Sequence, residues 1–416
     1  MAAFGKKKKA SEFPDVIPVS EAIRKGDIFT KLTCLIMGAG NLARKQIIQG
    51  LLFLAGELAY ILYMVFYGAK ALQNFVTLGT ETQRKVFNEA TQVYEYATGD
   101  NSQLCLLYGV ITLFVTIGFI LLWRGAIRSS YIAQKAQEAG KKPITFGEVL
   151  KSLKDNRMYQ LFLFFPFMGV LLFTVMPLVF MILMAFTNYD HDHLPPGQLF
   201  DWVGFQNFTK VLNAGGALGE TFWKVLGWTI IWAIFATFLN YIFGIILAII
   251  INRDGTKFKA FWRFIFVLTI AVPQFVSLLV VNTMIQQHGV INLLLKELFG
   301  VGPLPFLTNV TWARVTVIVV NLWVGIPYTL LTVTGILKNI PAELYEAAKV
   351  DGANAFVTFF KITMPYMMFV MTPNLITTFT GNINNFNVIY LLTNGAPACD
   401  TYYRGTAGKT DLLVTW

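Results

Sequence analysis

Seven long apolar runs alternate with polar segments along the 416-residue chain. A helix needs about 20 apolar residues to cross the hydrocarbon core, because backbone groups left unsatisfied in lipid cost several kcal/mol each. Each run is long enough to cross as an α-helix. The predicted spans cover residues 47–67, 104–123, 159–187, 221–251, 264–285, 315–337 and 366–389. The pattern therefore predicts an all-α polytopic membrane protein.

Composition and charge agree with this prediction. Apolar residues make up 55% of the chain and charged residues only 13%, which is far from the balance of a soluble domain. The net charge is +10, but 24 of the 33 Lys and Arg residues fall in the alternate segments 1–46, 124–158, 252–263 and 338–365. Cytoplasmic loops carry such an excess. We therefore expect a cytoplasmic amino terminus, and no nucleic acid as partner.

Seven spans leave residues 390–416 on the outer side, and this segment ends in the apolar residues 412–416. We expect an eighth span to follow, so the final span is apparently missing from this sequence. Prolines are the second irregular feature, because Pro166 and Pro177 in the third span and Pro273 in the fifth each remove a backbone donor and favour a kink. Kinked helices line cavities in transporters, although prolines are also commoner in membrane helices in general.

The cytoplasmic segment 338–365 is polar where its neighbours are apolar. Pro341 suits the first turn of a helix and Gly352 suits the residue that closes it, so we predict a short helix, a turn and a second short helix. Three- and four-residue spacing places four residues of the first helix on one face. They are Leu344, Ala347, Ala348 and Asp351. We interpret this face as a docking surface, because equal numbers of acids and bases disfavour the alternative of a helix resting on anionic lipid.

Within this segment, Glu346-Ala347-Ala348 is followed after three residues by Gly352, and after nine more by Ile362, one residue and Met364-Pro365. The arrangement resembles the EAA loop of ABC importer permeases, with Met364 where the family usually has Leu. The resemblance implies the transmembrane domain of a type I ABC importer, whose loop transmits movements of a separate ATPase. The residues expected to couple to that ATPase are Glu346, Ala347, Ala348, Asp351 and Gly352.

The resemblance extends over residues 158–416, and its details are similar to the larger permease subunit of maltose and maltodextrin importers. The motifs at 321–328 and 384–395 carry this likeness. It implies three parts: a cytoplasmic tail at 1–46, two extra amino-terminal transmembrane helices with a cytoplasmic loop at 47–157, and the permease core at 158–416. A bacterial plasma membrane is the expected location.

A sugar pathway needs polar side chains inside the membrane, where an unpaired amide is costly. Amides and a phenol occur at such positions in the last three spans, and the resemblance places them, with two apolar neighbours, at sugar contacts. The predicted substrate-binding residues are Gln274, Asn321, Val324, Gly325, Tyr328, Asn382 and Asn385. The alternative is that these amides bond neighbouring helices together. Ile270 and Gln274 depart from the tyrosine and serine expected in maltose carriers, so another oligosaccharide stays a second choice.

The predicted function is the permease subunit of an ATP-driven oligosaccharide importer, with maltose or maltodextrin as the first choice. The resemblance implies as partners a second homologous permease, two ATPase subunits and an extracellular sugar-binding protein. We expect no catalytic residue, no metal site and no cofactor, because ATP is bound by the partner. The alternative is an ion- or proton-coupled carrier acting alone, for which Glu57 within the first span is the candidate; an acid that is buried against a neighbouring span or protonated is the simpler interpretation.

Overall fold

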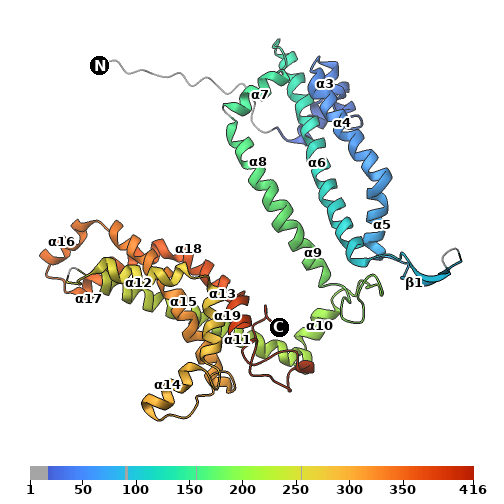
Figure 1. Ribbon diagram of the computed structural model, residues 1–416. Helices are drawn as coiled ribbons and strands as arrows, with labels where there is room; N and C mark the ends of the chain where they lie inside the picture. Colours follow the sequence, from blue (N-terminus) through green and yellow to red (C-terminus); the bar gives the residue numbers. More distant parts are fainter. Residues whose placement is uncertain (1–16, 90–91, 156, 254) are drawn as a thin grey trace, which may run out of the picture. The chain divides into compact units, whose positions relative to one another are not determined.

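The computed structural model describes residues 17–89, 92–155, 157–253 and 255–416. The chain forms two compact units, residues 1–207 and 208–416, which are coloured blue to green and yellow-green to red in Figure 1. Among the described residues, six helices are long and apolar enough to cross a membrane, and a bent pair of helices gives a possible seventh. The prediction of a helical polytopic protein is confirmed, and the bent pair falls in the fifth predicted span.

Three long helices form the first unit. The first consists of α4 (Ile47–Tyr63), a π-helical turn (Met64–Gly68) and α5 (Ala69–Thr77), and the second is α6 (Ser102–Glu138). The third consists of α8 (Met158–Val170), a π-helical turn (Leu171–Val175) and α9 (Met176–Met184). The third helix continues past Pro166 and Pro177 as one span, so these prolines do not break it. The π-helical turn between them supplies the local adjustment.

Polar side chains join α4 to α6 inside the apolar region. The Tyr60 ring stacks on Phe119 at 3.9 Å, and its hydroxyl donates to Thr116 Oγ1 at 3.1 Å. One turn further on, the hydroxyls of Tyr63 and Thr112 are 2.8 Å apart. Hydrogen bonds of this kind between transmembrane helices contribute about 1 kcal/mol each. They fix the register of the two helices.

Residues 17–46 are folded onto α6. They form α1 (Val19–Lys25), α2 (Ile28–Leu32) and α3 (Ala39–Ala43). The Arg44 guanidinium contacts Asp27 at 2.6 Å, and Gln134 of α6 accepts hydrogen bonds from the Asp27 amide and the Thr30 hydroxyl. The predicted cytoplasmic tail is therefore a structured segment from residue 17 onward, and residues 1–16 lie outside the described residues.

Glu57 accepts a hydrogen bond from the backbone N–H of Met37, with its Oε2 at 2.7 Å from that nitrogen. The carboxylate therefore satisfies a backbone donor in the segment between α2 and α3, which is a structural role for this acid.

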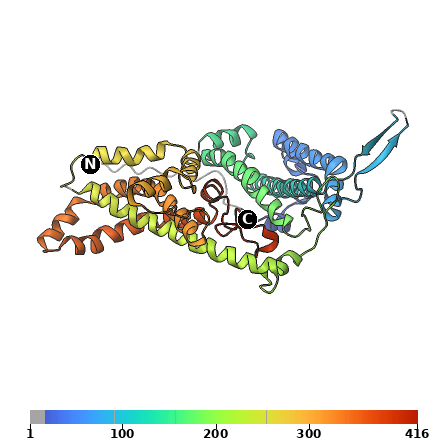
Figure 2. The same cartoon turned by 60° about the horizontal axis from the view of Figure 1, so that its bottom comes forward.

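The first unit also contains two elements that the apolar pattern did not predict. A hairpin of β1 (Arg84–Asn88) and β2 (Val93–Ala97) extends from the ends of α5 and α6, as Figure 2 shows. At the opposite end of α6, the amphipathic helix α7 (Phe146–Lys154) begins at Thr145, whose side chain forms a capping box with Glu148. Such a box fixes the first turn of a helix.

The second unit is built around α11 (Ala217–Asn252), which lies along α15 (Val310–Asn339) (Figure 2). Their contact buries Trp232, Ala236 and Val320. Shorter elements complete the unit. They are α10 (Gln206–Leu212), which begins just before it, α14 (Val290–Phe299), α19 (Phe386–Leu392) and a 3-10 turn (Tyr403–Gly405).

The fifth predicted span is broken. It consists of α12 (Lys259–Ala271) and α13 (Gln274–Met284), whose axes differ by 91°. Pro273 has no N–H to continue the ladder, and it forces the preceding Val272 into an extended conformation with ψ of 126°. The kink expected at Pro273 is therefore confirmed, and it is sharp enough that residues 264–285 form two helices rather than one.

The last described span begins earlier than predicted. The segments α17 (Ala355–Thr358), a π-helical turn (Phe359–Thr363) and α18 (Met364–Ile383) form one 29-residue helix. The second short helix expected in the loop is thus the first part of this span. The residues after α19 fold back onto α11, where Leu412 is buried in the core. The eighth span concerns residues beyond Trp416 and stays a prediction.

Candidate functional site

The break between α12 and α13 opens a cavity of about 140 Å³ against α15. Gln274 is the first residue of α13, so its side chain lies directly at the break, and Val324 and Tyr328 of α15 line the other wall. The ends of a broken helix also leave backbone N–H and C=O groups without intrahelical partners. Three of the seven predicted substrate-binding residues are therefore brought together at the break.

The chemistry of this cavity suits a hydroxylated ligand. Tyr328 is 55% exposed, and Trp323 beside it is also exposed, so both rings offer a flat apolar surface. Thr269 and Ser277, from the two sides of the break, add hydroxyl groups. Ile270 and Gln274, the two positions that depart from maltose carriers, both line this cavity.

Sequence reasoning missed Trp323, Thr269 and Ser277. Trp323 lies next to the predicted Val324 and could have been found from its place in the same motif. Thr269 and Ser277 lie in α12 and α13, on the two sides of the break, and would be about 12 Å apart along a straight helix. The bend at Pro273 brings them together.

Asn321 and Gly325 lie on the side of α15 that faces the protein interior. Asn321 is buried, and a Cβ added to Gly325 would lie 2.6 Å from both amide atoms of Asn240 in α11. The glycine therefore lets α11 approach α15 closely. Small residues have this role at many transmembrane helix contacts.

Asn382 and Asn385 make hydrogen bonds within the second unit. Asn382 Nδ2 donates to Thr237 Oγ1 at 2.9 Å, and the Asn382 carbonyl accepts from the Trp232 indole at 3.0 Å. Asn385 caps α19, because its Oδ1 accepts from the Val388 N–H at 3.2 Å. These contacts fit the alternative in which amides join helices. Sugar contact by both residues stays a prediction.

The segment after α15 forms the helix predicted from its polar pattern. Helix α16 (Ala342–Val350) follows Pro341, which is its N-cap, and ends before Gly352, whose φ of 71° is the left-handed conformation that favours glycine. Asn354 then caps α17 by accepting from the Val357 N–H at 2.9 Å. Residues 341–363 therefore form a helical hairpin, which we call the coupling hairpin.

All four residues predicted to share a face of α16 line one open cavity of about 450 Å³, between α16 and the start of the last span. A hydrogen bond of 3.1 Å between the hydroxyls of Tyr345 and Thr363 joins the two arms. Ala348 is buried within the hairpin, whereas Glu346 is exposed and points away from this cavity's lining. The hairpin is thus internally braced and keeps an exposed acid.

Large apolar side chains are exposed on the coupling hairpin. Val350, at the tip of α16, is 87% exposed, and Phe356 and Phe360 on the second arm are exposed as well. The arm itself continues into the membrane span without interruption. An exposed apolar patch on a polar loop is typical of a protein contact. The geometry therefore provides a surface at which a movement could be applied to the last span.

The sequence matches the family model of "Binding-protein-dependent transport system inner membrane component" over residues 240–407, which includes the cavity and the coupling hairpin. The chain belongs to this family of transport proteins. It is a multi-pass membrane protein and a permease subunit of an ABC importer. The predicted fold class and family are confirmed.

Several sugar permeases resemble the chain. It is 36% identical over 92% of its length to the galactooligosaccharides transport system permease protein GanP of Bacillus subtilis, of which 88% is covered. It is 35% identical over 92% of its length to the maltodextrin permease MalC of Streptococcus pneumoniae, of which 86% is covered. The maltose/maltodextrin permease MalF of Escherichia coli is 40% identical over 55% of this chain and 44% of its own length.

Proposed function

We propose that this chain conducts an oligosaccharide through the membrane, and that the sugar passes the cavity at the broken helix α12–α13. The observation that carries the proposal is the combination of Gln274, Tyr328 and Trp323 around one cavity. An amide can donate to and accept from hydroxyls, and an aromatic ring packs against the flatter face of a pyranose. Maltodextrin is the first substrate that we propose, because of the motifs at 321–328 and 384–395. Galactooligosaccharide is the second, since relatives named for the two sugars are almost equally similar to this chain.

We further propose the arrangement around this subunit. A second homologous permease completes the pathway, two ATPase subunits bind the coupling hairpins, and an extracellular binding protein delivers the sugar. ATP is bound by the ATPase subunits, and this chain carries no catalytic residue. Glu346, Ala347, Ala348, Asp351 and Gly352 are the residues proposed to transmit ATPase closure.

The proposed orientation places the amino terminus in the cytoplasm of a bacterial cell, with the chain in its plasma membrane. The proposed parts remain an amino-terminal segment up to residue 46, an accessory region at 47–157 and the permease core at 158–416. The boundary between the two compact units lies at residue 207 rather than at 157, because α9 packs on α6. The proposed parts therefore describe functional roles and do not coincide with the compact units.

Uptake of defined sugars by the complete complex in proteoliposomes tests the proposal. Tyr328→Ala and Gln274→Ala should each raise the sugar concentration for half-maximal uptake about tenfold or more, as expected for the loss of roughly 1.4 kcal/mol of binding. Phe369→Ala is the control, because Phe369 is an exposed aromatic of α18 outside the cavity. Basal ATPase activity should stay unchanged. Unaltered uptake in both cavity variants would contradict the pathway.

The carrier alternative has less support, because Glu57 is held by the Met37 N–H. Uptake driven by a proton gradient without ATP would favour it. Uptake that requires ATP, and that survives Glu57→Gln, would exclude it.

A further inference from the structure

The hairpin of β1 and β2 has no part in the proposed sugar pathway, and its two faces differ. Directly opposed residues of an antiparallel pair lie on the same face, and successive residues lie on opposite faces. The register pairs Lys85 with Tyr96 and Phe87 with Tyr94. These four residues therefore share one face of the hairpin, which we call the aromatic face.

The aromatic face is exposed. Tyr94 and Tyr96 are 68% and 60% exposed, and Phe87 is exposed as well. The rings of Phe87 and Tyr94 meet edge to face at 5.1 Å, and the Lys85 ammonium lies 5.4 Å from the centre of the Tyr96 ring. An isolated two-stranded hairpin is only marginally stable in water. A second surface that covers this face would stabilise the hairpin.

The base of the hairpin is fixed to the start of α6. Asp100 Oδ2 accepts from the backbone N–H groups of Thr80 at 2.8 Å and Glu81 at 3.1 Å. The Asp100 N–H donates in return to the Glu81 carbonyl at 2.7 Å. The next residue, Asn101, is the N-cap of α6. The hairpin is therefore joined to this membrane helix without a flexible linker.

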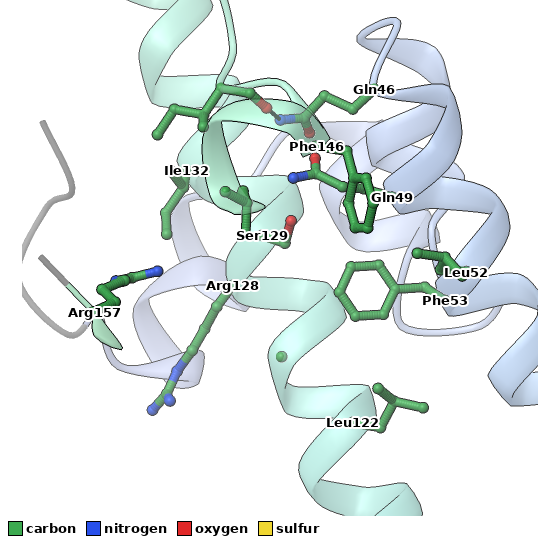
Figure 3. A pocket seen from close by; sticks show the side chains of 13 residues that line it. Gln46, Gln49, Leu52, Phe53, Leu122, Arg128, Ser129, Ile132, Phe146 and Arg157 are labelled. Carbon is green, nitrogen blue, oxygen red and sulfur yellow. Dashed lines mark hydrogen bonds between the residues drawn. The ribbon is translucent and has the colours of Figure 1, made fainter. Parts of the chain in front are cut away.

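The sequence of α6 shows at which depth this junction lies. Figure 3 shows the end of α6 away from the hairpin, where the apolar Leu122 is followed by Arg128 and Ser129. Residues 104–123 contain no charged residue. At 1.5 Å per residue they span about 30 Å, which is the thickness of the hydrocarbon core. The core therefore ends near Leu104, and the base of the hairpin lies at the level of the headgroups.

The direction of the hairpin keeps it near this level. Figure 1 shows it leaving the ends of α5 and α6 to the side, instead of continuing along the helices. Trp202 lies at the same end, where its indole N–H donates to the Phe75 carbonyl of α5 at 3.1 Å. Tryptophan and tyrosine are enriched at the headgroup level. The nearest surface that the aromatic face can reach is therefore the bilayer.

Charge and ring geometry indicate how the hairpin would bind. Residues 79–100 contain four acids and two bases, so attraction to anionic lipid is not the driving force. Burial of apolar area also holds amphipathic elements at an interface. The Phe87 and Tyr94 rings are inclined by 62°, so they do not form a flat platform for successive sugar rings. Rings at the headgroup level need no such platform.

We propose that the aromatic face lies in the headgroup region of the bilayer beside α5 and α6, which is the outer surface in the proposed orientation. Phe87, Tyr94 and Tyr96 enter the interface, and the Lys85 ammonium reaches the phosphates from its apolar stem. Interfacial aromatic residues set the tilt of membrane helices, so the hairpin anchors the first two spans. The proposal goes beyond transport and requires only that the chain lies in a membrane.

The test uses the full chain with its copurifying partners, made free of cysteine and placed in phosphatidylcholine vesicles. One environment-sensitive fluorophore is attached at Lys85→Cys, the aromatic-face probe, and in a second sample at Val86→Cys, the opposite-face probe. The two positions are adjacent and exposed, and the three aromatic residues stay in place. Quenching by lipids spin-labelled at the headgroup or along the acyl chain measures the depth of each probe. The aromatic-face probe should lie about 5–10 Å deeper.

Two variants carrying the aromatic-face probe test which side chains hold it. F87T/Y94T/Y96T keeps residues that favour strands but should raise the probe to the depth of the opposite-face probe. The control V86T/V93T changes the opposite face and should leave the depth unchanged. Amide hydrogen exchange over residues 84–97 checks that the strands stay paired, and the comparison of the two probes does not depend on either variant.

Four results would overturn the proposal. Equal depth of the two probes would exclude a preferred face, and a deeper opposite-face probe would place the other face on the bilayer. A depth that depends on added phosphatidylglycerol would replace apolar burial by attraction to charge. A blue shift of the aromatic-face probe on adding maltodextrin in detergent, or on adding the extracellular binding protein, without lipid quenching in vesicles, would identify a sugar or a protein as the occupant.

Discussion

Replacing Gly325 with Ala separates two roles for this residue, helix packing and sugar contact. The added Cβ would lie 2.6 Å from both Nδ2 and Oδ1 of Asn240, closer than carbon packs against these atoms. Asn240 has little freedom to move, because it is buried and its Nδ2 donates to the Ala236 carbonyl at 2.6 Å. Overpacking of this kind costs about 1–3 kcal/mol.

The control is Gly335→Ala in the same helix. A Cβ there meets nothing within 4 Å, so this variant shows only the gain in helix propensity, up to about 1 kcal/mol. Both substitutions share that gain. The difference between their free energies of unfolding should therefore equal the overpacking cost, about 1–3 kcal/mol, with Gly325→Ala the less stable.

Reversible unfolding by SDS in mixed micelles, followed by tryptophan fluorescence, measures this difference. In an Asn240→Ala background the crowding is removed, and Gly325→Ala should then behave like Gly335→Ala. Equal stability of the two variants in the parent background would refute the close contact. A loss of sugar uptake by Gly325→Ala without loss of stability would instead support the sugar contact predicted from the sequence.

Three other sets of substitutions test separate parts of the chain. Gly352→Leu should strain the left-handed residue by about 1–2 kcal/mol and reduce copurification of the ATPase. The control is Gly300→Leu, which is equally left-handed at φ of 66° but lies outside the coupling hairpin, so copurification should stay intact. Equal loss of copurification in both variants would contradict the coupling role. Asn385→Ala should cost about 1 kcal/mol through the lost cap and Asn385→Asp should recover it; loss of uptake in both at full stability would point to sugar contact instead. In a cysteine-free background, a cysteine at Gly197 but not at Gly140 should react with an impermeant maleimide added outside, and the reverse would overturn the orientation.

The apolar pattern predicted the long helices because lipid leaves the backbone few alternatives. It also located the break at Pro273, since a missing N–H is visible in the sequence. The angle of 91° was not predictable, because it depends on how α12 and α13 pack against α15 and α19. The short helices at 19–43 and the hairpin at 84–97 were missed because their apolar runs are too brief to indicate burial. Side-chain contacts such as those of Arg44 and Gln134 hold the short helices, and the sequence does not show such contacts.

The candidate site was predictable only in part. Gln274, Val324 and Tyr328 line one cavity, but Asn321 and Asn382 are buried, and their contact with sugar stays a prediction. An amide in a membrane helix can bind either a ligand or a neighbouring helix, and its residue type does not distinguish the two. On α11, Thr237 accepts a hydrogen bond from Asn382, and Asn240 lies against Gly325; neither contact could be inferred from the spacing within α15 or α18.

The second arm of the coupling hairpin and the last span form one continuous helix. Its 29 residues correspond to about 43 Å at 1.5 Å per residue, so a tilt of about 10° about one end displaces the other by about 7 Å. The helix runs without a break from Ala355 to Ile383, although it contains the π-helical turn at Phe359–Thr363 and two prolines, Pro365 and Pro373. On the proposed coupling role, a tilt of the hairpin would therefore move Asn382 and the core around Trp232 at the far end of the same helix.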